Sequence, residues 1–161
     1  MIDPRQFLQH PGRAGMFGAL MDEYARAAAD FCMVVEAISM DAWVEERESA
    51  DPDCRSLHAI ASHAVLAARG YASYIRGVRK MEPSDLRLNF VPPKTPADIR
   101  GALREAMHLT ENSLEGWYDA SDEEVVSHTF QVRWGPTYDP EMILEHAIVH
   151  LLRHRRQFER W

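Results

Sequence analysis

Cysteine is scarce in this sequence, with only Cys32 and Cys54 among 161 residues. That count implies no disulfide framework and favours reduced thiols in a cytoplasmic protein. The first fifteen residues lack a positively charged start followed by an apolar run, so we expect no signal peptide. No apolar run approaches the roughly 20 residues that span a membrane, so we expect no membrane segment.

The sequence also has no excess of basic over acidic residues. The chain carries 18 Lys and Arg against 25 Asp and Glu, which gives a net charge of −7. Binding to nucleic acid needs a basic surface, and we therefore expect no nucleic-acid partner. The one basic run, residues 153–160, stands where the last helix should end, and cations at that position stabilise the negative end of the helix dipole.

No linker, repeat or low-complexity tract divides the chain. Its 161 residues, of which 46% are hydrophobic, suffice to bury one core, so residues 1–161 should form a single domain. Apolar residues recur at three- and four-residue steps in four long segments, and this spacing predicts four helices. The segments cover roughly residues 14–40, 56–80, 96–117 and 139 to the C-terminus.

Local signals mark the ends of these helices. Ser56 and Asp139 are expected N-caps, and Pro140 stands in the first turn, where proline is tolerated. Residues 82–94, "EPSDLRLNFVPPK", contain three prolines and predict a loop. Residues 121–138 are mixed and predict a short β-hairpin or an irregular loop. Four helices with one long crossover loop indicate an all-α protein, a four-helix bundle.

The last predicted helix carries a row of histidines. His146, His150 and His154 stand four residues apart, so they share one helix face with apolar neighbours. A buried imidazole needs a partner for each ring nitrogen, and a bound cation supplies one. His146 and His154 are two turns apart, so one ion can take only two of the three. A further ligand must come from another helix, and His63 on the apolar face of the second helix is the best candidate.

The residues alone leave a second interpretation open. A histidine on an apolar face is more often a satisfied core residue than a metal ligand, and a single pair spaced by four is a weak signal. Gln157 shares the histidine face and could hydrogen-bond a ligand imidazole. Tyr71 and Tyr74 follow His63 on the second helix, where either could point at the site, but packing is the commoner role. Glu145 lies on a different face and is expected at solvent or an interface.

Two segments, "SLHAIASHAVLAARGY" and "EHAIVHLLRHRRQFE", together resemble the DinB/YfiT-like superfamily. The resemblance covers nearly the whole chain and ends in an H-x-x-x-H-R-x-Q signature at residues 150–157. It implies a four-helix bundle, usually dimeric, in which three histidines hold a divalent metal. His146 falls one turn before the signature and is not an implied ligand. The implied ligands are His63 from the second helix and His150 and His154 from the last.

The resemblance also implies an activity. Three protein ligands leave coordination positions open, as in catalytic metal sites, and a metal held in this way can activate water or a thiolate. Relatives include transferases and isomerases that use low-molecular-weight thiols. The implied function is therefore a homodimeric enzyme that uses zinc or nickel to transfer a thiol to a small electrophile.

Two alternatives accompany this function. A metal-dependent hydrolase would use the same open site to activate water. A non-enzymatic metal-binding dimeric bundle would instead have a closed coordination sphere with no pocket beside it. The chain also departs from the family pattern at Arg156, which stands where the signature often has glycine. That change touches no implied ligand, but it alters the surface beside the site.

Overall fold

A computed structural model describes all of residues 1–161 and is mostly helical, as the periodicity predicts. Its body consists of four long helices, α1 (Gly15–Glu36), α3 (Leu57–Val78), α4 (Ile99–Leu114) and α6 (Pro140–Phe158). Shorter elements connect them: the 3-10 turns η1 (Pro4–Phe7), η2 (Pro52–Cys54) and η3 (Pro96–Asp98), the helices α2 (Met40–Val44) and α5 (Asp122–Ser127), and the strands β1 (Phe130–Gln131) and β2 (Thr137–Tyr138).

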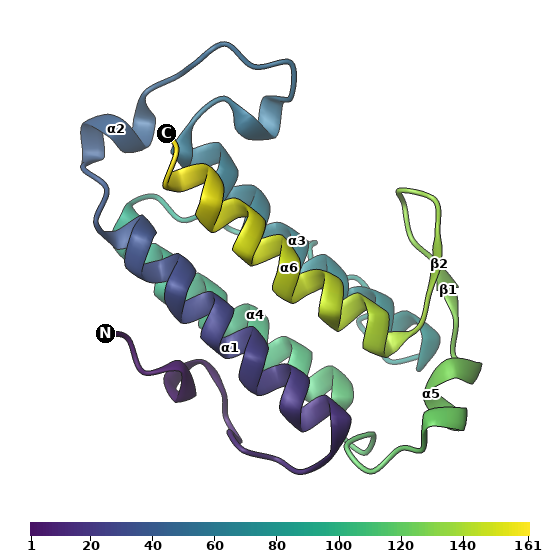
Figure 1. The fold of residues 1–161 in the computed structure, drawn as a ribbon. Coiled ribbons are helices and arrows are strands. Elements are labelled where there is room, and N and C mark those ends of the chain that lie inside the picture. The colour runs from purple at the N-terminus through teal and green to yellow at the C-terminus, as the bar shows by residue number, and fades with distance from the viewer.

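The long helices lie side by side around one core (Figure 1). α1 packs against α4 and α6, and α3 packs against the same two helices. Arg155 near the end of α6 pairs with Asp30 of α1, whereas Arg100 at the start of α4 pairs with Glu36 at the end of α1. α1 therefore runs parallel to α6 and antiparallel to α4. Because α3 and α4 run in the same direction, residues 79–98 cross back along the helices, as the proline-rich loop predicts.

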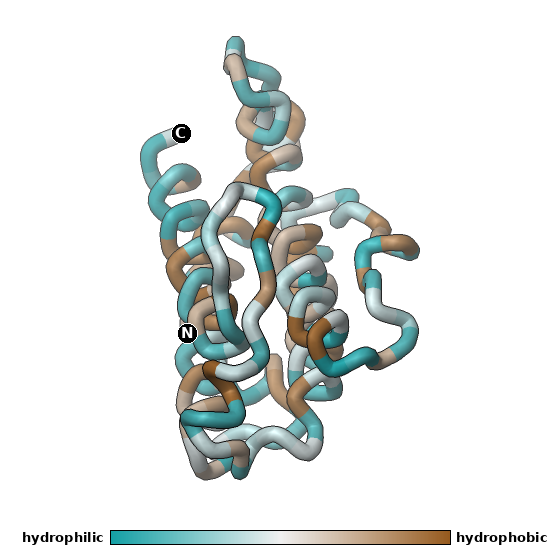
Figure 2. The backbone as a smooth tube through the Cα atoms, turned by 90° about the vertical axis from the view of Figure 1, so that its right-hand side faces the viewer, coloured by the Kyte–Doolittle hydropathy of each residue, from teal (hydrophilic) through white to brown (hydrophobic).

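Each long helix buries an apolar stripe. Figure 2 shows hydrophobic and hydrophilic positions alternating along these helices, as expected where one side faces a core. The buried side chains form one contiguous cluster to which all four helices contribute. This cluster includes Phe17 and Phe31 of α1, Ile60 and Ile75 of α3, Leu103 and Met107 of α4, and Leu144 and Leu151 of α6.

Capping residues set the helix boundaries. Ser56 and Asp139 cap α3 and α6 as predicted, because their side chains accept hydrogen bonds from first-turn backbone N–H groups at 3.0 and 2.9 Å. The first predicted helix is too long: α1 ends at Glu36, and Ser39 caps the separate helix α2. The third predicted helix begins too early, because Pro96 lies in the 3-10 turn that precedes α4.

The mixed stretch 121–138 forms α5 and a hairpin of β1 and β2. The hairpin prediction is confirmed, whereas the short helix was not predicted. The hairpin turn contains Trp134 and then Gly135, whose φ of +117° lies in a region that only glycine adopts readily. Tyr74 of α3 accepts a hydrogen bond from the backbone N–H of Arg133 at 3.0 Å, so the turn is tied to the helix body.

The hydropathy of the helices and the state of the two cysteines agree with the sequence analysis. None of the helices has the length and hydropathy needed to cross a bilayer. Cys32 and Cys54 are both free, so the fold depends on no disulfide. Cys32 is buried in α1, and this burial raises the pKa of its thiol to about 12, which leaves it a packing residue.

Candidate metal centre

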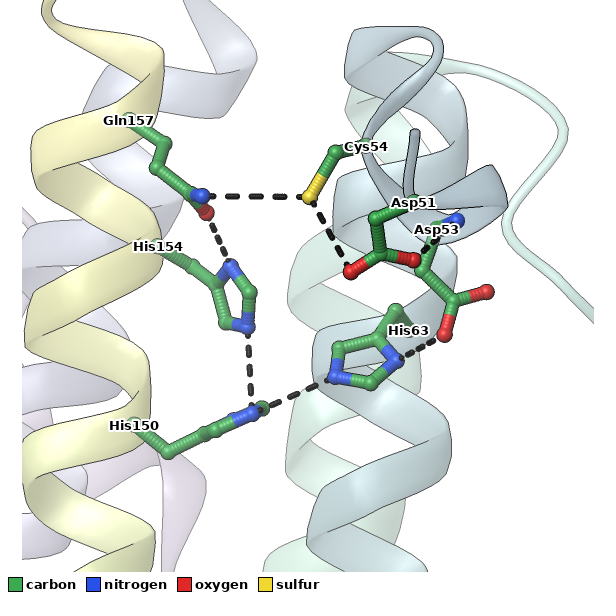
Figure 3. Close-up of polar contacts among 7 residues, drawn as sticks. All are labelled: Asp51, Asp53, Cys54, His63, His150, His154 and Gln157. Carbon is green, nitrogen blue, oxygen red and sulfur yellow. Dashed lines mark hydrogen bonds and ion pairs between the residues drawn. The ribbon is translucent and has the colours of Figure 1, made fainter. Parts of the chain in front are cut away.

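The three histidines selected from the sequence meet where α3 and α6 run antiparallel (Figure 3). His63 comes from α3, and His150 and His154 come from successive turns of α6. The Nε2 atom of His150 lies 3.3 Å from Nε2 of His63 and 3.1 Å from Nε2 of His154. One ligand atom from each ring lies within 4.8 Å of the others, so together they could hold one metal ion. We call these three residues the histidine cluster.

Hydrogen bonds at Nδ1 orient two of the three rings. Asp53 of η2 places Oδ2 2.8 Å from Nδ1 of His63, and Gln157 places Oε1 2.5 Å from Nδ1 of His154. Both oxygens accept a hydrogen bond, so each of these Nδ1 atoms carries the ring proton and each Nε2 presents a lone pair. Gln157 therefore makes the predicted contact with one of the candidate ligand imidazoles, that of His154. The third ring differs, because Nδ1 of His150 is buried without a hydrogen-bond partner.

These tautomers create a conflict that a cation resolves. His63 and His154 both present lone pairs toward Nε2 of His150, and a neutral His150 can donate its single proton to only one of them. The other contact then brings two lone pairs together without a proton. A metal ion accepts all three lone pairs, and nitrogen ligands about 2.0–2.1 Å from a tetrahedral ion lie roughly 3.3 Å apart. The two separations from His150, 3.1 and 3.3 Å, match that spacing, and all three ligand atoms lie within 4.8 Å of one another.

Burial keeps two of these rings neutral. Desolvation, and then the neighbouring histidines, lower the pKa of His150 to about 3. Desolvation also lowers the pKa of His154 to about 4, although its hydrogen bond with Gln157 opposes the shift. Neutral imidazole is the form that binds metal, so these two rings need not lose a proton to bind an ion at neutral pH.

A cavity of about 760 Å³ adjoins the histidine cluster. Its volume lies within the usual range of small-molecule sites. His63 and His150 form part of its wall, whereas His154 lies deeper and is only 5% exposed. The remaining wall comes from Asp53, Leu66, Ala67, Gly70, Tyr71, Tyr74, Arg87, Arg133, Trp134, His146 and Arg153. A second cavity, of about 500 Å³ beside η1, contains no histidine or cysteine.

His146 lies beside the histidine cluster rather than in it. Its ring stacks on Trp134 of the hairpin turn with centroids 4.7 Å apart, and its Nδ1 lies 3.5 Å from the hydroxyl of Tyr138. Tyr71 contacts the rings of His146 and His150 edge-on, with centroids 5.4 and 5.6 Å apart. His146 therefore belongs to the aromatic wall of the cavity, one turn of α6 before the first of the two α6 histidines.

Other residues considered from the sequence lie outside the cavity. Glu145 is exposed on α6, as expected. Arg155 of the signature pairs with Asp30 at 3.2 Å and so braces α6 against α1. Sequence reasoning missed Asp53 and Trp134, because both lie in connecting segments where no periodic pattern points to a site.

No protein-family model, curated protein or solved structure matches this chain. The resemblance to DinB/YfiT-like proteins therefore stays a prediction that rests on the histidine signature. What the site can do follows from its own geometry: three convergent imidazole nitrogens beside a cavity large enough for a small molecule.

Proposed function

We propose that this chain is a divalent-metal-dependent enzyme with a four-helix bundle of the DinB/YfiT-like type. The observation that carries the proposal is the convergence of the three Nε2 atoms of the histidine cluster at the wall of a cavity. Zinc and nickel are the ions we expect, since neutral imidazole suits both. Three protein ligands leave room for a further ligand, as in catalytic rather than structural zinc sites.

The chain's own residues would prepare this site for chemistry. A bound ion would supply Lewis acidity that favours the deprotonated form of a thiol or water. Asp53 and Gln157 hold the rings of His63 and His154 in the tautomers that present Nε2. Tyr71 packs edge-on against His150 and lines the same cavity.

The reaction we propose is transfer of a low-molecular-weight thiol to a small electrophile. Sulfur forms a bond to the electrophilic carbon, and the displaced group leaves with the electrons of the broken bond and receives the thiol proton. The choice of a thiol is supported by the resemblance to thiol-dependent relatives. The cavity beside the histidine cluster supports a small-molecule substrate, because the electrophile needs space next to the ligand atoms.

Hydrolysis is the second candidate. His63 and His150 are only half-buried and line the cavity, which leaves space for water beside the histidine cluster. A non-enzymatic metal-binding bundle is less well supported, because its closed coordination sphere would not need an adjoining cavity. A homodimer is supported by apolar side chains exposed on α6, namely Met142, Val149 and Leu152.

The first test is the metal content of untagged protein by mass spectrometry, after incubation with zinc or nickel and removal of free ion. We expect about one ion per chain, lost in the His150→Ala/His154→Ala double variant and retained in His10→Ala. The His10 side chain is exposed and remote from the histidine cluster, which makes that variant a matched control. Failure of the wild-type protein to bind either ion would contradict the proposal.

A second test separates the two reactions. Metal-loaded protein is incubated with a low-molecular-weight thiol and a panel of small electrophiles, and loss of free thiol is followed. Thiol consumption that disappears in the double variant would support transfer. Breakdown of ester or amide substrates without thiol consumption would favour the hydrolase.

A further inference from the structure

The wall of the cavity beside the histidine cluster carries positive charge, although the chain as a whole is acidic. We propose that this cavity binds a small organic anion, a carboxylate or phosphate ester with an apolar body, through Arg133 and Arg153. The inference rests on the proposed function for its biological meaning, since it names the substrate class of that site. The side chains that carry it differ from the metal ligands, so it can be tested separately.

Three guanidinium groups line the cavity, and they are not equivalent. Arg87 is held by Asp85, whose two carboxylate oxygens each accept a bond of 2.8 Å. Arg133 and Arg153 have no carboxylate partner. The one carboxylate in the wall, Asp53, accepts a hydrogen bond from His63. Two positive charges therefore face the cavity without a counter-ion, in a chain whose net charge is −7.

The two unpaired arginines approach the cavity from different elements. Arg153 lies on α6 immediately before His154, and Arg133 lies at the hairpin turn, where Tyr74 binds its backbone N–H. Both side chains line the same cavity. An anion between α6 and the hairpin turn could therefore accept hydrogen bonds from both guanidinium groups.

The chemistry of the wall defines the ligand class. A guanidinium presents its N–H groups in a fork that matches carboxylate and phosphate oxygens, and such charge-assisted bonds are stronger than neutral ones. Leu66, Ala67, Tyr71 and Trp134 supply apolar and aromatic surface in the same cavity. A neutral ligand could use that surface but would gain nothing from the arginines, and a cation would be repelled. The combination fits an anion with an apolar body.

Calorimetric titration of phenyl phosphate, benzoate and benzyl alcohol tests this inference. Both metal-free and zinc-loaded protein are titrated. We expect both anions to bind each form at least about tenfold more tightly than the alcohol, because charge-assisted bonds are worth over a kcal/mol. The Arg133→Gln/Arg153→Gln double variant should lose that preference and keep its affinity for the alcohol. Arg156→Gln, which changes an exposed arginine of α6 outside the cavity, should behave as wild type.

Three results would overturn the inference. The first is no binding of either anion, or anion affinity no higher than that of the alcohol. The second is an anion affinity that the double variant leaves unchanged. The third is anion binding that requires zinc and ignores the arginine variants, because the metal would then be the anion's only partner. The metal content of the same samples is measured independently, so failure of the metal centre is recognised separately from failure of the arginine pair.

Discussion

Asp53 and His63 are joined by a hydrogen bond of 2.8 Å between Oδ2 and Nδ1. Asp53 lies in η2, directly before the helix that carries His63, so a short stretch of chain supplies both the ligand and the group that orients it. With the proton held at Nδ1, Nε2 is left to face His150. Asp53 is therefore part of the candidate site, although it does not belong to the histidine cluster.

Replacement of Asp53 should weaken metal binding without abolishing it. We expect Asp53→Ala to lower zinc affinity by about 10–100-fold, as for other groups that orient a ligand histidine. The zinc affinity of Asp53→Asn should fall in between, because an amide oxygen can still accept the hydrogen bond from Nδ1–H but carries no charge. Competition with a chromophoric chelator measures the affinity. Glu48→Gln, an exposed change in the same connecting segment, is the control. Wild-type affinity in Asp53→Ala would contradict this role.

Metal-free protein should become more stable when His150 is made apolar. Nδ1 of His150 is buried without a partner, and its Nε2 faces two other imidazoles. We expect His150→Leu to raise the free energy of unfolding by about 1 kcal/mol, since it removes a buried polar atom that has no hydrogen-bond partner. Urea denaturation with chelator present checks this value, with His146→Leu as the comparison. A less stable His150→Leu variant would show that the ring packs favourably without metal.

Acid should destabilise the metal-free protein. Burial depresses the pKa of His150 to about 3 and of His154 to about 4 in the folded chain, against about 6.5 in the unfolded chain. Between these values the unfolded chain binds protons that the folded chain does not, so stability falls as the pH drops from about 6.5 toward 4. Each histidine contributes up to about 1.4 kcal/mol per pH unit.

Urea midpoints at several pH values between about 7 and 5 measure this dependence. In a His150→Leu/His154→Leu variant the two protonation sites are gone, so its stability should vary less with pH. If wild type and variant have the same slope, the two rings titrate alike in the folded and unfolded chains.

Glu111 should anchor the N-terminal segment. This carboxylate of α4 is 3% exposed and accepts hydrogen bonds from the backbone N–H groups of Gln9 at 2.7 Å and His10 at 3.0 Å. Glu111→Ala leaves both donors without this partner, and we expect it to lower the free energy of unfolding by about 2 kcal/mol. Denaturant unfolding and limited proteolysis of the N-terminal segment report the effect.

The control for that variant is Glu115→Ala on the neighbouring turn. Its exposed carboxylate pairs with Arg13 at 3.0 Å, and an ion pair in contact with solvent contributes little, so we expect a change below about 0.5 kcal/mol. If both variants lower the free energy of unfolding equally, the burial of Glu111 does not account for its contribution to stability.

The long elements were predictable because repeated spacing reports a buried face. Ser56 and Asp139 marked the starts of α3 and α6 for the same local reason, since a side-chain oxygen there binds first-turn N–H groups. Helix α2 was not predicted because five residues hold too few turns for a period to show. Its place depends instead on a long-range contact, in which buried Trp43 donates a hydrogen bond to the carbonyl of Lys94 at 3.1 Å.

The candidate site was predictable only in part, for a related reason. Spacing on one helix leaves two pairs open among the three histidines of α6, and the resemblance selects His150 and His154. His63 follows from its place on an apolar face of the second helix. Asp53 and Trp134 could not be chosen, because their contacts with histidines depend on how η2 and the hairpin fold back onto the helices. Tertiary contacts of this kind leave no periodic trace in the sequence.

Helices α3 and α6, which are far apart in the sequence, meet at the histidine cluster. His63 and His150 are 87 positions apart, so an ion shared by them would act as a reversible cross-link. Because the two ligands come together only in the folded chain, the ion would bind the folded form and add stability that grows with ion concentration. Metal supply would then set how long each molecule survives proteolysis as well as whether it is active.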